Sequence, residues 1–75
     1  MRKDITVIAK MKHTGQIEPL SILWEDGREI KIDRVLDCRM KASTKGGGTG
    51  LRYTVRIGNN ERYLFLDHFI WFIEI

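Results

Sequence analysis

Apolar and polar residues alternate along most of this chain, which is the pattern of half-buried β-strands. In the first such segment Ile5, Val7 and Met11 share one face, and only Ile8 breaks the alternation. The two-residue period predicts strands over residues 5–11, 20–24, 30–42, 51–57, 62–66 and 69–74. The third of these must bend or break near Asp33, because Arg34 would otherwise point into the core.

Turn signals separate the segments. Asp26-Gly27 is typical of a type I′ turn, which would place Glu25 opposite Arg28 in a β-hairpin. Pro19 excludes a central strand at its position, so the second strand is expected to start at Leu20 and to point Leu20, Ile22 and Trp24 inward. The run Gly58-Asn59-Asn60 predicts a further turn.

The C-terminal segment is the least regular part of the pattern, because Tyr63, Leu66, Ile70 and Ile73 also fit one face of a helix. Its density of aromatic and β-branched residues favours strands, and one short helical turn near Asp67 is compatible with the sequence. The expected fold is therefore all-β: a small antiparallel SH3-like barrel of five or six strands. An open sheet is the alternative, but closure would remove exposed strand edges.

Length and composition describe a single small domain spanning residues 1–75. Hydrophobic residues make up 43% of the chain and charged residues 31%, which is a globular composition. The lone Cys38 excludes an intramolecular disulfide, so the apolar core must hold the fold. The apolar run from Ile5 to Ala9 is too short for a signal peptide or a membrane span. We therefore expect a cytoplasmic protein with no membrane contact.

The chain resembles a group of small uncharacterised bacterial all-β proteins with no assigned activity. The resemblance covers most of the chain and is carried by residues 24–28 (Trp-Glu-Asp-Gly-Arg), residues 32–37 (Ile-Asp-Arg-Val-Leu-Asp), Arg39, Ala42-Ser43, Arg52-Tyr53 and Trp71-Phe72. It implies a compact SH3-like barrel, and it provides no functional residues to transfer to this chain.

Positive charge is concentrated between residues 34 and 56. This stretch contains six of the thirteen Lys and Arg residues but only one acid, Asp37, whereas the whole chain has a net charge of +3. It reads as two strands flanking a glycine-rich loop, residues 43–50, and such a hairpin would gather the charge on one ribbon. The ribbon and its loop predict contacts with nucleic-acid phosphates through Arg39, Lys41, Lys45, Arg52 and Arg56.

Catalytic and metal sites are not expected. Cys38, His13, His68 and Asp67 supply the residue types of a Cys-His-Asp arrangement, but Cys38 is in phase with apolar neighbours and is expected to be a buried, inert side chain. Two separated histidines and one thiol do not match a metal-ligand spacing. The glycine-rich loop lacks the Gly-Lys-Ser/Thr ending of a phosphate-binding loop. We expect no enzyme activity and no cofactor.

The last segment suggests a different function. If Phe69, Trp71 and Ile73 point inward, Ile70 and Phe72 point outward, and both faces of the strand are apolar. An outward apolar pair predicts a contact with a protein partner or a second copy of the chain. The favoured interpretation is thus a small binding or accessory module that acts through protein contacts. A nucleic-acid-binding module using residues 34–56 is the alternative.

Overall fold

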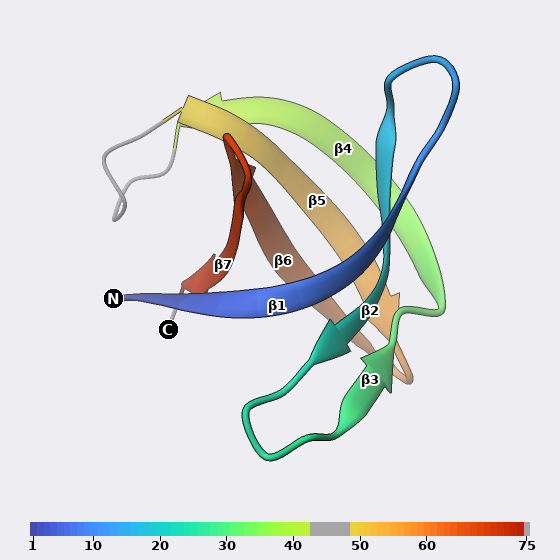
Figure 1. Cartoon of the computed structure of the whole chain (residues 1–75), viewed down its shortest axis with the longest axis vertical. Coiled ribbons are helices and arrows are strands. Elements are labelled where there is room, and N and C mark those ends of the chain that lie inside the picture. The colour runs from blue at the N-terminus through green and yellow to red at the C-terminus, as the bar shows by residue number, and fades with distance from the viewer. Residues whose placement is uncertain (43–48, 75) are drawn as a thin grey trace.

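The computed structural model describes residues 1–42 and 49–74, and these residues form seven β-strands and no helix (Figure 1). The strands are β1 (Arg2–Met11), β2 (Ile17–Leu23), β3 (Glu29–Lys31), β4 (Arg34–Ala42), β5 (Thr49–Ile57), β6 (Asn60–Asp67) and β7 (Ile70–Glu74). The all-β prediction is confirmed. The predicted break near Asp33 separates β3 from β4, so the sheet has one or two strands more than expected, and no helical turn forms at Asp67.

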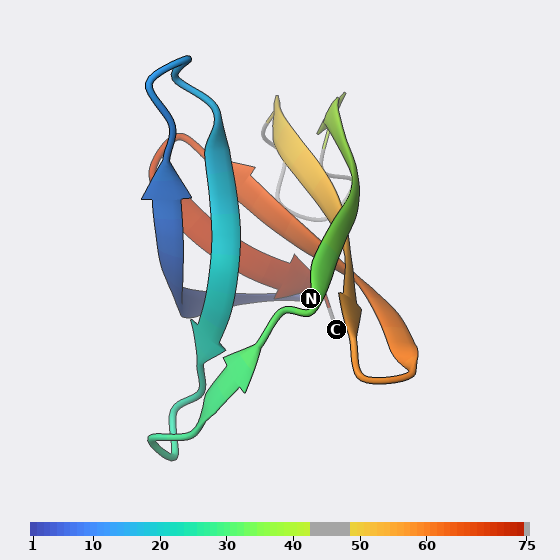
Figure 2. The same cartoon turned by 90° about the vertical axis from the view of Figure 1, so that its right-hand side faces the viewer.

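All seven strands belong to one antiparallel sheet with the order β3-β2-β1-β7-β6-β5-β4. The chain therefore folds as two meanders, β1-β2-β3 and β4-β5-β6-β7, which are joined by pairing of the first strand with the last, from Arg2 opposite Glu74 to Ile5 opposite Trp71. The sheet curls into a half-barrel in which the strand pairs β1-β2 and β4-β5 stand on opposite sides (Figure 2). Within the described residues, β4 pairs only with β5, so the sheet does not close.

The link between β3 and β4 ties the two sides of the half-barrel together. The backbone N–H of Ile32 donates to the carbonyl of Leu20 at 3.0 Å, and the next N–H, that of Asp33, donates to the carbonyl of Arg56 at 2.9 Å. The Asp33 carboxylate accepts a 2.7 Å hydrogen bond from the N–H of Gly58. Two consecutive residues thus bond to β2 and to β5, which fixes the curvature of the sheet.

The core lies on the concave side of the sheet. Its buried members are Ile22, Tyr53, Val55, Leu64 and Leu66. Tyr53 is 2% exposed, its ring centroid lies 5.4 Å from that of Trp71, and its hydroxyl donates a 2.6 Å hydrogen bond to the carbonyl of Ile17 across the half-barrel. Burial raises the pKa of Tyr53 to about 12, because ionisation would place a charge among apolar side chains.

The β2-β3 hairpin forms, but not with the predicted turn. Gly27 has a φ of 91°, whereas Asp26 does not adopt a positive φ, so the two positive angles of a type I′ turn are not present. The N–H of Gly27 donates to the carbonyl of Trp24, and the N–H of Trp24 donates to the carbonyl of Arg28. The loop thus has three residues and a bulge at glycine, and Arg28 faces Trp24 rather than Glu25.

The second strand begins three residues earlier than predicted and contains Pro19, paired with Ala9. Proline is tolerated because β3 flanks β2 only over Ser21–Leu23, which leaves the first part of β2 with one described neighbour and no need for a second ladder. A register shift lies beside it, because the consecutive residues Ile8 and Ala9 pair with Ser21 and Pro19 and leave Leu20 as the extra residue of β2. Leu20, which was expected to point inward, is exposed.

The prediction that Cys38 is buried is wrong. A bulge between Val35 and Asp37 resets the register of β4, so that Cys38 lies opposite Tyr53 and Met40 lies opposite Leu51, both on the concave side. β4 is the edge strand on the open side of the half-barrel, with β5 as its one described neighbour, so this part of its concave side is poorly covered. As a result Cys38 is exposed and Met40 is 83% exposed.

Candidate binding groove and basic face

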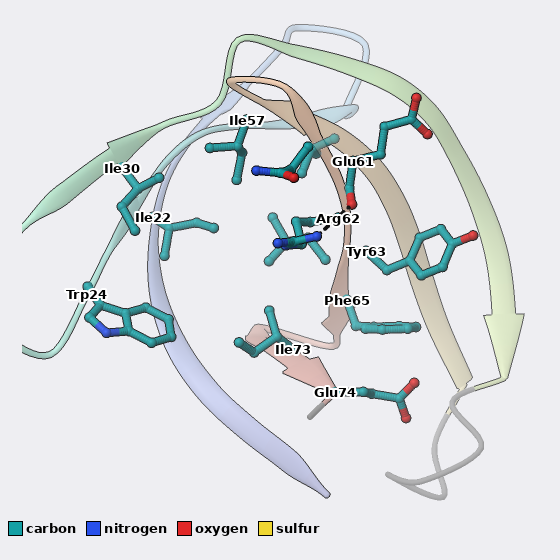
Figure 3. Close-up of a pocket in the computed structure, with 13 residues that line it drawn as sticks. Ile22, Trp24, Ile30, Ile57, Glu61, Arg62, Tyr63, Phe65, Ile73 and Glu74 are labelled. Carbon is teal, nitrogen blue, oxygen red and sulfur yellow. Dashed lines mark hydrogen bonds between the residues drawn. The ribbon is translucent and has the colours of Figure 1, made fainter.

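An apolar groove of about 580 Å³ opens at the end of the half-barrel that carries the β2-β3 hairpin. Figure 3 shows its wall, with Ile22, Trp24 and Ile30 on one side and Ile57 and Ile73 on the other. These side chains are close together because alternation places them all on the concave face of strands that converge at this end. Most of the groove's lining is therefore hydrocarbon, with the ring of Trp24 as its largest flat surface.

The groove follows a strand edge that has no neighbour. β6 pairs with β7 only from Phe65 opposite Phe72 to Asp67 opposite Ile70, and the two strands then diverge. Residues 60–64 of β6 pair with β5 on one side and with none of the described strands on the other. Because strand backbones alternate in the direction of their N–H and C=O groups, part of the backbone of these five residues faces the groove.

Arg62 places a positive charge at the groove. It has the same phase along β6 as the buried Leu64 and Leu66, so it belongs to the concave face. Figure 3 shows its guanidinium group in the middle of the view, between Ile22 and Tyr63. Its described hydrogen bond runs from Nη1 to the carbonyl of Glu61, at 3.3 Å. The remaining guanidinium N–H groups leave Arg62 with capacity to bind a carboxylate.

The four arginines between residues 34 and 56 lie on the convex face, in two directly opposed pairs. The β4-β5 register sets Arg39 opposite Arg52 and Arg34 opposite Arg56, and it places the backbone of Lys41 opposite Gly50. The sequence therefore grouped Arg39, Arg52 and Arg56 on the face where the structure has them, and Arg34 joins them. Lys45 lies outside the described residues.

Neighbouring groups modify this basic face unevenly. Asp37 binds the Nε of Arg39 at 2.6 Å, and Glu61 lies 3.7 Å from a guanidinium nitrogen of Arg56. Arg52 instead lies over the ring of Tyr63, with 4.5 Å between the guanidinium carbon and the ring centroid, and its Nε is buried without a hydrogen-bond partner among the described residues. The face thus combines cations with an aromatic ring that is 55% exposed.

The two apolar residues predicted to contact a partner differ in accessibility. Both lie on the convex face, but Ile70 is exposed whereas Phe72 is 1% exposed. The ring of Phe72 stacks on that of Phe65 at 5.1 Å, and the guanidinium of Arg2 covers it at 4.1 Å. Phe72 is therefore not available for a partner contact. Phe69, expected inside, is instead 91% exposed in the turn between β6 and β7.

The candidate catalytic residues are not assembled into one site. Cys38 borders a hollow of about 200 Å³ lined by Lys12, Gln16, Ile17, Glu18, Val35 and Tyr53, which include no histidine. His68 bonds its neighbour Asp67 at 2.8 Å in the β6-β7 turn. Partial burial raises the pKa of the Cys38 thiol, an effect that the nearby Asp37 carboxylate increases. Among residues 1–42 and 49–74, no three His, Cys, Asp or Glu side chains are grouped as metal ligands would be.

Sequence reasoning did not identify the groove, although one signal was present. Arg62 interrupts the apolar phase of Leu64 and Leu66, just as Arg34 interrupts that of Ile30 and Ile32. The divergence of β6 from β7, in contrast, has no signature in the local sequence.

Comparison with protein-family models, with curated proteins and with solved structures finds no match for this chain. None of the described residues forms a helix long and apolar enough to cross a membrane.

Proposed function

We propose that this protein is a binding module that receives an extended segment of a partner protein in the apolar groove, alongside residues 60–64 of β6. The observation that carries the proposal is the coincidence of an apolar groove of about 580 Å³ with a strand edge that has no described neighbour. A strand added to such an edge forms main-chain hydrogen bonds, and its alternate side chains enter the adjacent pocket.

The lining of the groove specifies the chemistry of the segment. The wall of Ile22, Trp24, Ile57 and Ile73 accepts an apolar side chain, and burying one such side chain contributes about 1.5 to 3 kcal/mol. Arg62 favours a carboxylate on the same segment, because an ion pair at the edge of an apolar surface is less screened than one in open water. The partner segment thus combines apolar residues with an Asp or Glu.

A second copy of this chain fits the edge poorly. Antiparallel pairing of two copies through residues 60–64 has its centre at Arg62, and it would set two guanidinium groups opposite each other. Like charges directly opposed across a strand pair are destabilising. Arg62 therefore disfavours self-association, whereas a carboxylate on a different partner would pair with it.

Selection from a displayed library of random peptides of about 12 residues, followed by titration of the selected peptides, tests this function. We expect apolar and acidic sequences, and we expect Arg62→Glu to weaken their binding by about tenfold or more. Lys31→Glu is the matched control, because it makes the same charge change at an exposed position of β3 outside the groove. Methylating alternate backbone nitrogens of the peptide should also weaken binding, because it removes ladder donors.

Two results would overturn the proposal. One is a selection that yields no peptide specific for the folded protein. The other is equal loss of binding in Arg62→Glu and Lys31→Glu, which would show that the peptides respond to overall charge and not to the groove.

We also propose a fold relationship, a non-catalytic role and a cellular location for this protein. The half-barrel is an open relative of the SH3-like barrel, a view supported by its short, strongly curved strands and by the sharp link between β3 and β4. A binding role without catalysis agrees with the separation of Cys38 from His68. The free thiol of Cys38 supports action in the reducing cytoplasm.

A further inference from the structure

The arginines on the convex face are arranged in a way that folding alone does not favour. Arg39 opposes Arg52, and Arg34 opposes Arg56, although directly opposed like charges weaken a strand pair. Asp37 and Glu61 compensate part of this charge through Arg39 and Arg56. No carboxylate among the described ion pairs lies on Arg34 or Arg52. The face therefore has an excess of positive charge.

Tyr63 gives this charged face a flat aromatic surface. Tyr63 is 55% exposed and lies on β6, next to β5, which carries Arg52. The guanidinium carbon of Arg52 lies 4.5 Å from the centroid of its ring. Figure 3 shows the ring pointing away from the centre of the groove. A guanidinium group beside an exposed ring can contact a phosphate while the ring stacks on a base.

We propose that this convex face, formed by Arg39, Arg52, Arg56 and Tyr63, is a second binding site and that its ligand is single-stranded nucleic acid. A base stacks on Tyr63, and the neighbouring phosphates contact the arginines on β4 and β5. A duplex fits less well, because its bases are stacked on one another and their faces do not reach a ring on a sheet surface. No base-reading motif is present, so binding is largely independent of sequence.

This site is separate from the proposed partner groove. The groove lies on the concave side of the sheet, whereas the arginine pairs lie on the convex side. Tyr63 borders both, because it lines the edge of the groove while its ring points away from the centre of the groove. Arg39 and Arg56 do not line the groove, so their variants test the convex face with the groove in place, and the failure of one proposal would not decide the other.

Fluorescence anisotropy with labelled oligothymidylate and oligouridylate of about 12 nucleotides, and with a duplex of equal length, tests the inference at low ionic strength. We expect the single strands to bind more tightly than the duplex. Three arginine contacts predict a slope near −2 for log K against log[salt], from about −0.7 per phosphate on single strands. Heparin, a polyanion without bases, is the competitor that separates stacking from charge.

Three variants assign the contributions. Tyr63→Ala should weaken single-strand binding roughly tenfold, while Tyr63→Phe should keep it, because stacking requires the ring and not the hydroxyl. Arg39→Ala combined with Arg56→Ala should flatten the salt slope by about 1.4. Circular dichroism of each variant confirms the fold, and binding of a groove-selected peptide shows that the concave site is unaffected.

Lys10→Ala combined with Lys12→Ala is the control for the loss of two positive charges. Lys10 lies near the end of β1, Lys12 follows that strand, and both are next to Glu18. Arg2 and Lys3 are unsuitable controls, since they cover the rings of Phe72 and Trp24. Equal weakening by the lysine pair and the arginine pair would overturn the inference. Absence of binding at low salt, or unchanged binding in Tyr63→Ala, would also overturn it.

Discussion

Removing the hydroxyl group of Tyr53 tests the hydrogen bond that joins the two sides of the half-barrel. The hydroxyl donates a 2.6 Å hydrogen bond from β5 to the carbonyl of Ile17 at the start of β2, and so it joins the two sides of the half-barrel where β2 and β4 do not pair. Tyr53→Phe keeps the ring, its 5.4 Å packing on Trp71 and its buried area. The substitution therefore tests the hydrogen bond with little other change.

The expected cost can be worked from this geometry. A net hydrogen bond between uncharged groups contributes about 0.5 to 1.5 kcal/mol, and leaving a partly buried carbonyl without its donor raises the cost toward 3 kcal/mol. Ile17 is half-buried, so water reaches its carbonyl incompletely. We expect Tyr53→Phe to lower the free energy of unfolding by about 1 to 2 kcal/mol. In a domain of this size each kcal/mol corresponds to a shift in Tm of about 4 to 8 °C.

Urea unfolding followed by tryptophan fluorescence measures this change, and the m value should stay the same because the buried surface is unchanged. Tyr63→Phe is the control, since its hydroxyl makes no described hydrogen bond and its ring is largely exposed. An unfolding midpoint for Tyr53→Phe that equals that of the wild type would refute the argument that this bond holds the open side of the half-barrel.

Ionisation of Tyr53 should also lower the free energy of unfolding at high pH. Folding raises the pKa of Tyr53 to about 12 from an unfolded value near 10, so the folded state favours the neutral phenol. The stability linked to this group is complete below about pH 10 and is lost as pH rises through 12. Wild type should therefore lose more stability than Tyr53→Phe between these values. Parallel pH profiles would show that Tyr53 ionises as freely in the folded state as in the unfolded chain.

Two further predictions concern β5 and β4. Gly50→Ala should destabilise the protein by about 1 to 3 kcal/mol in the same urea assay, because an added Cβ would collide with the carbonyl oxygen of Leu66 and lie 3.1 Å from the Cα of Asp67; an equal or higher midpoint would contradict this close approach. A thiol reagent should label Cys38 in the native protein without denaturant, at a rate that keeps rising above pH 9.0 because its pKa is raised; labelling only after unfolding would show that the thiol is buried.

The sequence predicted those features that depend on alternation within one strand. The period of two identified most strands and their inner faces, since a side chain's face follows directly from its position in the strand. It also grouped Arg39, Arg52 and Arg56, because their phase within β4 and β5 needs only the register of one hairpin. The break at Asp33 was equally visible, because Arg34 would otherwise enter the core.

The alternation of residues does not show whether other residues cover a given face of a strand. The wrong predictions concern this coverage. Cys38 has the inward phase, but it lies on a strand whose inner side no other strand covers. Phe72 has the outward phase, but Phe65 and Arg2 bury it. The groove beside Arg62 depends on how far β6 and β7 remain paired. That is a property of the curvature of the whole sheet, which no short stretch of sequence encodes.

The pairing of β1 with β7 has a consequence for how the protein is made. This ladder joins the two meanders at the middle of the sheet, and it links the first strand of the chain to the last. During translation, β1-β2-β3 can form its hairpins before its partner strand β7 is available, because β4, β5 and β6 come between them in the chain. Contacts between distant parts of a chain also form slowly, because the intervening segment must first be brought together. The two meanders therefore join only after β7 has left the ribosome, and until then the unpaired backbone edge of β1 at residues 2–5 is exposed to other chains and to chaperones.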